Sequence, residues 1–187
     1  MNPHTIRPLQ PSDPAPIALA FEAIGWAKPR EQYERYLGEQ AAGDRHVFVA
    51  WMGDAFAGYV TLNWRPEYPP FRAEGIPVIE DFNVLPAFRR RGIGSALMDA
   101  AEAAAGARSR VVGIGVGLDP DYGPAQRLYA LRGYVPDGRG ISWQNRTVAY
   151  RDQVLVDDDL VLWLTRTLSA VTETMENARD TAEHVTG

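Results

Sequence analysis

The order of elements that the sequence predicts favours a three-layer α/β sandwich, in which a mixed central sheet carries helices on both faces. Three observations support this fold class. Apolar runs of strand length alternate with segments of helical periodicity, and the run Val78–Val84 leads through a glycine-containing turn into an alanine-rich helix. Neither a repeat nor a shift in composition marks a second domain. We therefore predict one domain over residues 1–168, followed by a helical or frayed tail over 169–187.

The first half of the chain is expected to contain three strands besides Val78–Val84, together with two helices. Gly53-Asp54 separates two of the strands and is typical of a hairpin turn. A segment rich in proline and aromatic residues follows, and we expect it to form a loop. In chain order these elements are Thr5–Leu9, Ala15–Ile24, Pro29–Ala42, His46–Met52, Phe56–Asn63 and the loop Arg65–Gly75.

In the second half, strands and helices alternate again, and glycines mark their ends. The expected helix Pro124–Leu131 has an apolar face and is followed by Gly133, which is a common helix stop. Asp137–Gly140 is expected to be a structural loop. The remaining predicted elements are the helix Ser95–Ala105, the strand Val111–Leu118, the turn Asp119–Gly123 and the strand Asp159–Thr165.

The composition excludes several kinds of site. The sequence has no cysteine, so disulfides, thiolate metal sites and cysteine nucleophiles are ruled out. The histidines His4, His46 and His184 show no ligand spacing, and we expect no metal. A net charge of −5 disfavours nucleic-acid binding and is compatible with a small cationic substrate. No apolar run is long enough to span a membrane, and no secretory signal is expected, so the prediction is a cytoplasmic protein.

The turn Arg89–Ser95 is the strongest functional signal in the sequence. It follows a predicted strand and precedes a predicted helix, so the free N–H groups of the first helical turn point at the loop. Gly92 and Gly94 lack a Cβ atom and let the main chain close around an anion. Three consecutive arginines add positive charge at the rim. The turn therefore predicts a site for a phosphate-bearing ligand.

Two motifs make the chain resemble the GNAT superfamily of acetyl-CoA-dependent N-acetyltransferases. The first is Arg89-Arg90-Arg91-Gly92-Ile93-Gly94, placed after the strand Val78–Val84. The second is Ala125-Gln126-Arg127-Leu128-Tyr129 followed by Gly133-Tyr134. Either motif alone is weak, but both occur in the family's order. One departure is Tyr122, which stands where the family often has asparagine.

The resemblance implies how acetyl-CoA would bind as the acyl donor. Its pyrophosphate would lie against the backbone N–H groups of the glycine turn, and its pantetheine arm would pair with backbone near Val84. A backbone N–H near Val84 would also stabilise the oxyanion. The expected donor-binding residues are Val84, Arg89, Arg91, Gly92, Ile93, Gly94 and Ser95. A plain helix start is the structural alternative for this turn.

For catalysis, the resemblance and the chemistry together indicate a base and an acid. A protonated amine has a pKa of about 10 and must lose its proton before it attacks a thioester. Glu80 and Asp81 lie in an apolar strand, where desolvation raises a carboxylate pKa. Strand alternation predicts that they point to opposite faces, and we favour Glu80 as the base. Tyr129 is the expected general acid for the departing thiolate. A structural hydrogen-bonding role for the carboxylates and a core role for Tyr129 remain open.

The acceptor site is the least determined part of the prediction. The family often lines it with the segment that here contains Trp64, Tyr68 and Phe71, and Trp26 is expected in the opposite wall. The same segment would serve equally as a lid packed on the core. The acceptor is expected to be a primary amine, and a homodimer is expected because members of the family commonly form one.

Two other classes of protein were weighed. Nucleotide-binding folds are disfavoured because Gly113, Gly115 and Gly117 alternate within a predicted strand, and no P-loop pattern occurs. The serious alternative is a non-catalytic acyl-CoA-binding sensor or interaction module. In an N-acetyltransferase that acts by direct transfer, Tyr129 and a strand carboxylate are expected to reach the thioester. In a binding module they are not.

Overall fold

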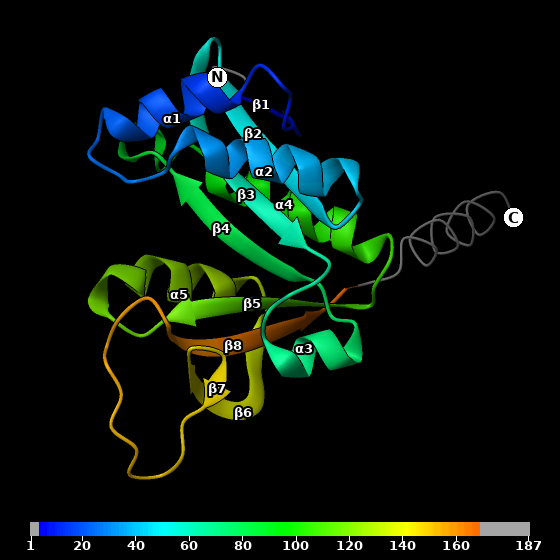
Figure 1. Cartoon of the computed structure of the whole chain (residues 1–187), viewed down its shortest axis with the longest axis vertical. Coiled ribbons are helices and arrows are strands. Elements are labelled where there is room, and N and C mark those ends of the chain that lie inside the picture. Colours follow the sequence, from blue (N-terminus) through cyan, green and yellow to red (C-terminus); the bar gives the residue numbers. More distant parts are fainter. Residues whose placement is uncertain (1–3, 169–187) are drawn as a thin grey trace, which may run out of the picture. The chain divides into compact units, whose positions relative to one another are not determined.

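The structure, a computed structural model, describes residues 4–168 and is shown in Figure 1. The chain forms two compact units, and the boundary between them falls after Ala101, within helix α4 (Ile93–Gly106). The predicted tail over residues 169–187 lies outside the described residues. Within residues 4–168, no helix combines the length and the apolar character that crossing a bilayer requires.

The first unit contains four antiparallel strands that neighbour each other in chain order (Figure 1). The hairpin predicted at Gly53-Asp54 is present, and Gly53 has the positive φ of 59° that such a turn favours. Strand β4 has the bounds that the sequence predicted. The four strands are β1 (His4–Pro8), β2 (Arg45–Met52), β3 (Ala55–Asn63) and β4 (Val78–Val84).

Helices α1 (Pro14–Glu22) and α2 (Arg30–Ala41) contact each other, and α2 also contacts β2. An aromatic cluster fills the space beneath them, in which Phe21, Tyr33 and Tyr59 are fully buried. The rings of Tyr33 and Tyr59 meet edge to face, with centroids 5.4 Å apart. These helices therefore obtain their stability from packing on the sheet rather than from capping side chains, which neither helix has.

The prediction of a loop over Arg65–Gly75 was wrong, because this segment contains helix α3 (Pro69–Glu74). Its prolines stand at the first helical positions, where a missing N–H costs nothing. Gly75 ends the helix in the left-handed conformation with φ 67°. Phe71 is fully buried and anchors the helix. Both terminal signals were present in the sequence, but the helix is too short for its apolar periodicity to be recognised.

Strand β4 contains a bulge opposite β3. Thr61 pairs with Glu80, and Tyr59 pairs with Asn83. Between these pairs β3 has one residue, Val60, whereas β4 has two, Asp81 and Phe82. Asp81 takes φ 49°, the left-handed conformation that often accommodates an extra residue. The bulge interrupts the regular alternation of side chains at the point where the two predicted catalytic carboxylates lie.

The second unit also has four antiparallel strands, in the spatial order β5-β8-β6-β7. Two of them, β6 (Val135–Trp143) and β7 (Arg146–Thr147), were not predicted. The residues Asp137–Gly140 interrupt the pairing of β6 with β8, and both of their glycines have positive φ. The sequence predicted a structural loop at these residues. They form instead an irregularity within strand β6. The other elements are β5 (Val111–Gly117), β8 (Leu160–Thr167) and α5 (Gly123–Leu131).

The alternating glycines of β5 make room for side chains of its neighbours. A Cβ atom on Gly115 would lie 2.8 Å from Val161 Cγ1, and one on Gly117 would lie 2.5 Å from the ring of Tyr122. Glu102 accepts hydrogen bonds from Arg132 and from the Tyr134 hydroxyl in the same unit. These glycines are therefore packing positions of a sheet and not part of a nucleotide-binding turn.

Close to the bulge, β4 approaches β3 so closely that glycine is required at position 58, which pairs with Val84. A Cβ atom on Gly58 would lie only 2.4 Å from the carbonyl oxygen of Asn83. We therefore expect Gly58→Ala to lower the free energy of unfolding by roughly 1–3 kcal/mol, measured by urea denaturation. Gly38→Ala is the matched control, because Gly38 lies in α2 with no atom within 4 Å of its added Cβ. That change should stabilise the protein by about 0.5–1 kcal/mol. Equal effects of the two changes would contradict the role assigned to Gly58.

Candidate active site

The turn after β4 has the geometry of an anion-binding loop. A short 3₁₀ turn, Pro86–Phe88, precedes it, and Arg90 and Gly92 have φ values of 59° and 79°. The N–H of Ala96 donates to the Gly92 carbonyl at 3.0 Å, which is the first hydrogen bond of the helical ladder. The amides that precede Ala96 in the first turn of α4 therefore have no acceptor within the helix and are available to a ligand.

The two glycines of this turn serve different purposes. Gly92 holds a left-handed conformation that other residues adopt only with strain. Gly94 has an ordinary conformation, but a Cβ atom there would lie 3.2 Å from Phe82 Cζ and 3.7 Å from Val84 Cγ2. Gly92 therefore shapes the loop, whereas Gly94 lets the first turn of α4 approach the side chains of β4.

The three arginines of the turn are exposed, and two of them have partners within the first unit. Arg89 Nε donates to the Val84 carbonyl oxygen at 3.1 Å and so ties the turn to the end of β4. The Arg91 guanidinium lies 5.8 Å from the centre of the Phe88 ring. Positive charge thus surrounds the free amides, and the residues present fit a phosphate-bearing ligand.

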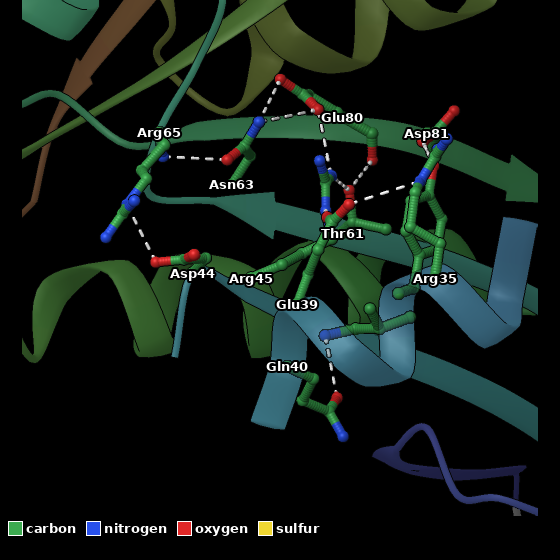
Figure 2. A network of polar contacts seen from close by, with 12 residues as sticks. Arg35, Glu39, Gln40, Asp44, Arg45, Thr61, Asn63, Arg65, Glu80 and Asp81 are labelled. Atoms are coloured by element: carbon green, nitrogen blue, oxygen red, sulfur yellow. Dashed lines mark hydrogen bonds and ion pairs between the residues drawn. The ribbon is translucent and has the colours of Figure 1, made fainter. Parts of the chain in front are cut away.

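Glu80 lies in a network of hydrogen bonds between β2, β3 and β4, shown in Figure 2. Arg45 Nη1 donates to Glu80 Oε2 at 3.0 Å and to Thr61 Oγ1 at 2.8 Å. Asn63 Nδ2 donates to Glu80 Oε1 at 3.2 Å. Arg45 also pairs through Nε with Glu39 of α2. Since Arg45 is buried, these contacts hold the Glu80 carboxylate in one position.

Two opposing effects set the proton affinity of Glu80. Burial raises the pKa of Glu80 above its ordinary value, whereas the charge and the hydrogen bond of Arg45 lower it, and burial prevails. The side chain keeps 30% of its surface exposed, so the carboxylate is still accessible from outside. A positioned and accessible carboxylate with a raised pKa has the properties required of a general base.

Asp81 forms a second cluster next to Glu80. The Tyr36 hydroxyl of α2 donates to Asp81 Oδ2, and Lys28 Nζ lies 3.6 Å from Asp81 Oδ1. The Arg45 guanidinium lies 4.7 Å from the centre of the Tyr36 ring and so connects the two clusters. Glu80 and Asp81 therefore both face the side of the sheet that α2 covers. The expectation that they point to opposite faces was wrong, because the bulge removes the alternation.

Three tyrosines surround this part of the sheet. Burial raises the pKa of Tyr33, Tyr36 and Tyr59 above the ordinary value, and the nearby Asp81 carboxylate adds to this effect. Their hydroxyls therefore stay protonated and act as neutral hydrogen-bonding groups. Gln32 Nε2 donates to the hydroxyls of Tyr36 and Tyr59 at 3.0 and 3.3 Å. The tyrosines and the carboxylates form one polar layer between α2 and the sheet.

Tyr129 lies in α5 of the second unit and is 5% exposed. Its ring is tilted against that of Tyr134, with centroids 6.0 Å apart. Burial raises the pKa of Tyr129, so the phenol retains its proton. Tyr122, at the position where a GNAT asparagine is common, donates to Asp158 Oδ1 at 3.1 Å and packs over Gly117. The assignment of Tyr129 as the acid stays a prediction.

The residues predicted for the acceptor site divide into two groups. Tyr68 and Phe71 are 2% and 0% exposed and meet edge to face at 5.0 Å, so they pack as core side chains. Trp64 is half-buried, and its Nε1 donates to His46 Nδ1 at 3.3 Å. Trp26 stacks on Phe21 and is also half-buried. Of these aromatic residues, Trp26 and Trp64 retain surface that a ligand can contact.

Trp26 lines an open pocket of about 510 Å³ at the connection between α1 and α2. Lys28 and Glu22 line the same pocket, so its wall carries both charge signs. Lys28 also pairs with Asp81, so the pocket lies beside the polar layer on β4. Sequence reasoning identified Trp26 but missed Lys28, Tyr36 and Arg45.

Fold and site together define an α/β protein with a glycine turn that fits a phosphate group and with paired carboxylates on the strand before it. A model of the acetyltransferase (GNAT) family matches residues 14–134, which is well over half of the chain. The chain therefore belongs to the GNAT family of acetyltransferases. No curated protein is similar enough to match.

Solved structures agree with this assignment at the level of the fold. An N-acetyltransferase from Staphylococcus aureus is 16% identical, with a TM-score of 0.65, over 89% of this chain and 99% of that chain. Ard1 from Thermoplasma volcanium is 20% identical, with a TM-score of 0.64, over 89% and 98%. Arabidopsis thaliana NAA60 in complex with acetyl-CoA is 16% identical, with a TM-score of 0.63, over 89% and 99%.

These comparisons confirm the predicted fold class and the resemblance that the two sequence motifs indicated. Membership of the family makes the chain an acyltransferase, with acetyl-CoA as the acyl donor. The non-catalytic binding module is correspondingly disfavoured. Within residues 4–168, no three acidic or histidine side chains are arranged to hold a metal ion.

The conformation of Gly92 gives a test of the donor site. We expect Gly92→Ala to weaken acetyl-CoA binding about tenfold in a calorimetric titration, because an L-residue strains a backbone with φ 79°. Gly53→Ala is the control, since Gly53 has a similar φ of 59° in the β2–β3 hairpin. It should cost comparable stability and leave acetyl-CoA affinity unchanged. Normal affinity in the Gly92 variant would remove this turn from the donor site.

Proposed function

We propose that the chain is an N-acetyltransferase that moves the acetyl group of acetyl-CoA directly to a primary amine in a ternary complex. The observation that carries this proposal is the pair of positioned carboxylates, Glu80 and Asp81, on the strand that leads into the glycine turn. One strand thus connects an anion site for the donor with a proton acceptor for the amine.

In this proposal the donor is held by main-chain groups. The amides from Arg91 to Ser95 bind the pyrophosphate, supported by the helix dipole of α4. The pantetheine arm lies along the end of β4, and a backbone N–H near Val84 stabilises the oxyanion that forms during attack. Arg89 contributes by fixing the turn on the Val84 carbonyl. Gly92 shapes the turn through its left-handed conformation, and Gly94 leaves room for the side chains of Phe82 and Val84.

The two carboxylates take different parts. Asp81 is already paired with an ammonium group, that of Lys28, and therefore suits the binding of a cationic amine. Glu80 has the raised pKa and accepts the proton that the amine must lose. Arg45 is a positioning residue, since it holds Glu80 through a direct hydrogen bond. The net charge of −5 also favours a cationic acceptor.

Tyr129 is proposed as the acid that gives its proton to the departing thiolate. The support for this role is the family motif around it and the raised pKa that keeps the phenol protonated. The absence of cysteine favours direct transfer of the acetyl group from sulfur to nitrogen over a route through a cysteinyl intermediate.

Release of coenzyme A tests the proposal directly. Since the protein has no cysteine, a thiol-reactive dye reports only the coenzyme A that is set free. We expect amine-dependent release, lowered by about 10²–10⁴-fold in Glu80→Gln and in Tyr129→Phe, with unchanged acetyl-CoA affinity. Glu31→Gln, an exposed change in the first turn of α2, is the control and should react normally. Absence of release over a broad panel of amines, with acetyl-CoA still bound, would favour a binding module instead.

A further inference from the structure

The sequence contains a single lysine. Its 19 basic residues are arginines except for Lys28, which lies in the connection between α1 and α2. Arginine carries a guanidinium that does not lose its proton in proteins, whereas lysine carries a primary amine that becomes nucleophilic once deprotonated. Lys28 is therefore the one side chain of this sequence that can accept an acetyl group on nitrogen in the reaction proposed above.

The position of this lysine is specific. Lys28 Nζ lies 3.6 Å from Asp81 Oδ1, and 26% of its side chain is exposed. Asp81 occupies the β4 bulge directly after Glu80, and the Tyr36 hydroxyl donates to its other oxygen. The pocket beside Trp26 gives this part of the chain access to solvent. The ammonium of Lys28 thus lies beside Asp81, which directly follows the proposed base in the chain and is expected to bind an external amine.

We propose that Lys28 is an acceptor of the chain's own activity, so that the protein acetylates itself at this position. The inference rests on the proposed N-acetyl transfer and adds the chain itself as a substrate. Lys28 also competes with an external cationic amine for Asp81 as long as it carries its charge. Its acetylation converts the ammonium to a neutral amide and leaves Asp81 free to bind the external amine.

The step balances with acetyl-CoA as its only co-reactant. The Lys28 ammonium loses one proton to the Glu80 carboxylate, and Nζ attacks the thioester carbonyl. The N–C bond forms and the C–S bond breaks, while Tyr129 gives its proton to the departing thiolate and takes the second proton from nitrogen in return. The products are Nζ-acetyl-lysine, coenzyme A and the proton that Glu80 passes to water.

Transfer requires Lys28 Nζ to move from Asp81 along β4 toward the donor. Asp81 and Val84 are three residues apart, which corresponds to about 10 Å of extended strand. The four-carbon stem of lysine is flexible, so Nζ can leave Asp81 and turn toward Val84. The short connection between α1 and α2, from Ala23 to Pro29, contains Gly25 in a left-handed conformation and forms no helix of its own.

Mass spectrometry of one peptide tests the inference. The full-length protein is incubated with acetyl-CoA without an added amine and then cleaved after glutamate. The peptide Ala23–Glu31 contains Lys28 and is separate from the α-amino group at Met1. We expect it to gain one acetyl group at a rate per molecule that does not change on dilution. Tyr129→Phe and Glu80→Gln should lower that rate by about 10²-fold or more.

Three controls make the result decisive. Lys28→Arg keeps a positive charge next to Asp81 and should give no acetylated peptide, although it still binds acetyl-CoA. A sample unfolded in urea measures the uncatalysed reaction of the same lysine. An added amine should slow the acetylation of Lys28 by competing for Asp81.

The inference is overturned if Lys28 reacts no faster in the folded protein than in urea, or if its rate rises in proportion to protein concentration. Failure of the proposed function is distinguished by the coenzyme A assay on the same preparation. Amine-dependent release with an unmodified Lys28 removes the inference alone, whereas the absence of both reactions removes both.

Discussion

The bulge in β4 is the constraint on which the proposed chemistry depends. One extra residue, with Asp81 in the left-handed conformation, brings two consecutive carboxylates to the same side of the strand. Regular alternation would have placed Glu80 with Phe82 and Val84, whose side chains face Gly94 of α4. Glu80 reaches Arg45 from the regular part of the strand, and because of the bulge Asp81 reaches Tyr36 and Lys28 on the same side. A base and a cation-binding group thus lie side by side.

The surroundings of the bulge keep it in place. Gly58 of β3 lacks the Cβ atom that would collide with the Asn83 carbonyl. Arg45 is buried and joins β2 to α2 through Glu39 and to β4 through Glu80. Removing one member of such a buried network leaves its partners uncompensated, so the network favours a single arrangement of the carboxylates. Figure 2 shows how many of these contacts converge on Arg45.

Much of the fold could be predicted because its signals are local. The bounds of β4, the hairpin at Gly53 and the glycine turn after β4 each depend on neighbouring residues. Helix α3 was missed because it is too short to show an apolar periodicity. Strand β6 was missed because the residues Asp137–Gly140 within it have the composition of a turn. These errors arose where a tertiary or cross-strand contact overrides the local signal.

The candidate site was predictable only in part, for the same reason. Glu80, Asp81 and the glycine turn follow from a motif that lies on one strand and its exit. Their partners come from elsewhere, since Tyr36 is 45 residues from Asp81 and Arg45 is 35 residues from Glu80. The sequence pointed to Lys28 in one way only, because this residue is the single lysine among 19 basic residues. Its meaning becomes apparent only when the ion pair with Asp81 is seen.

Initial rates measured over a matrix of acetyl-CoA and amine concentrations test direct transfer most directly. If the amine takes the acetyl group while both substrates are bound, double-reciprocal plots for acetyl-CoA at several amine concentrations will intersect. Parallel lines would instead show that the acetyl group passes through an acetylated intermediate, which forms before the amine binds. That result would contradict the proposal that the β4 carboxylates act on an amine bound together with its donor.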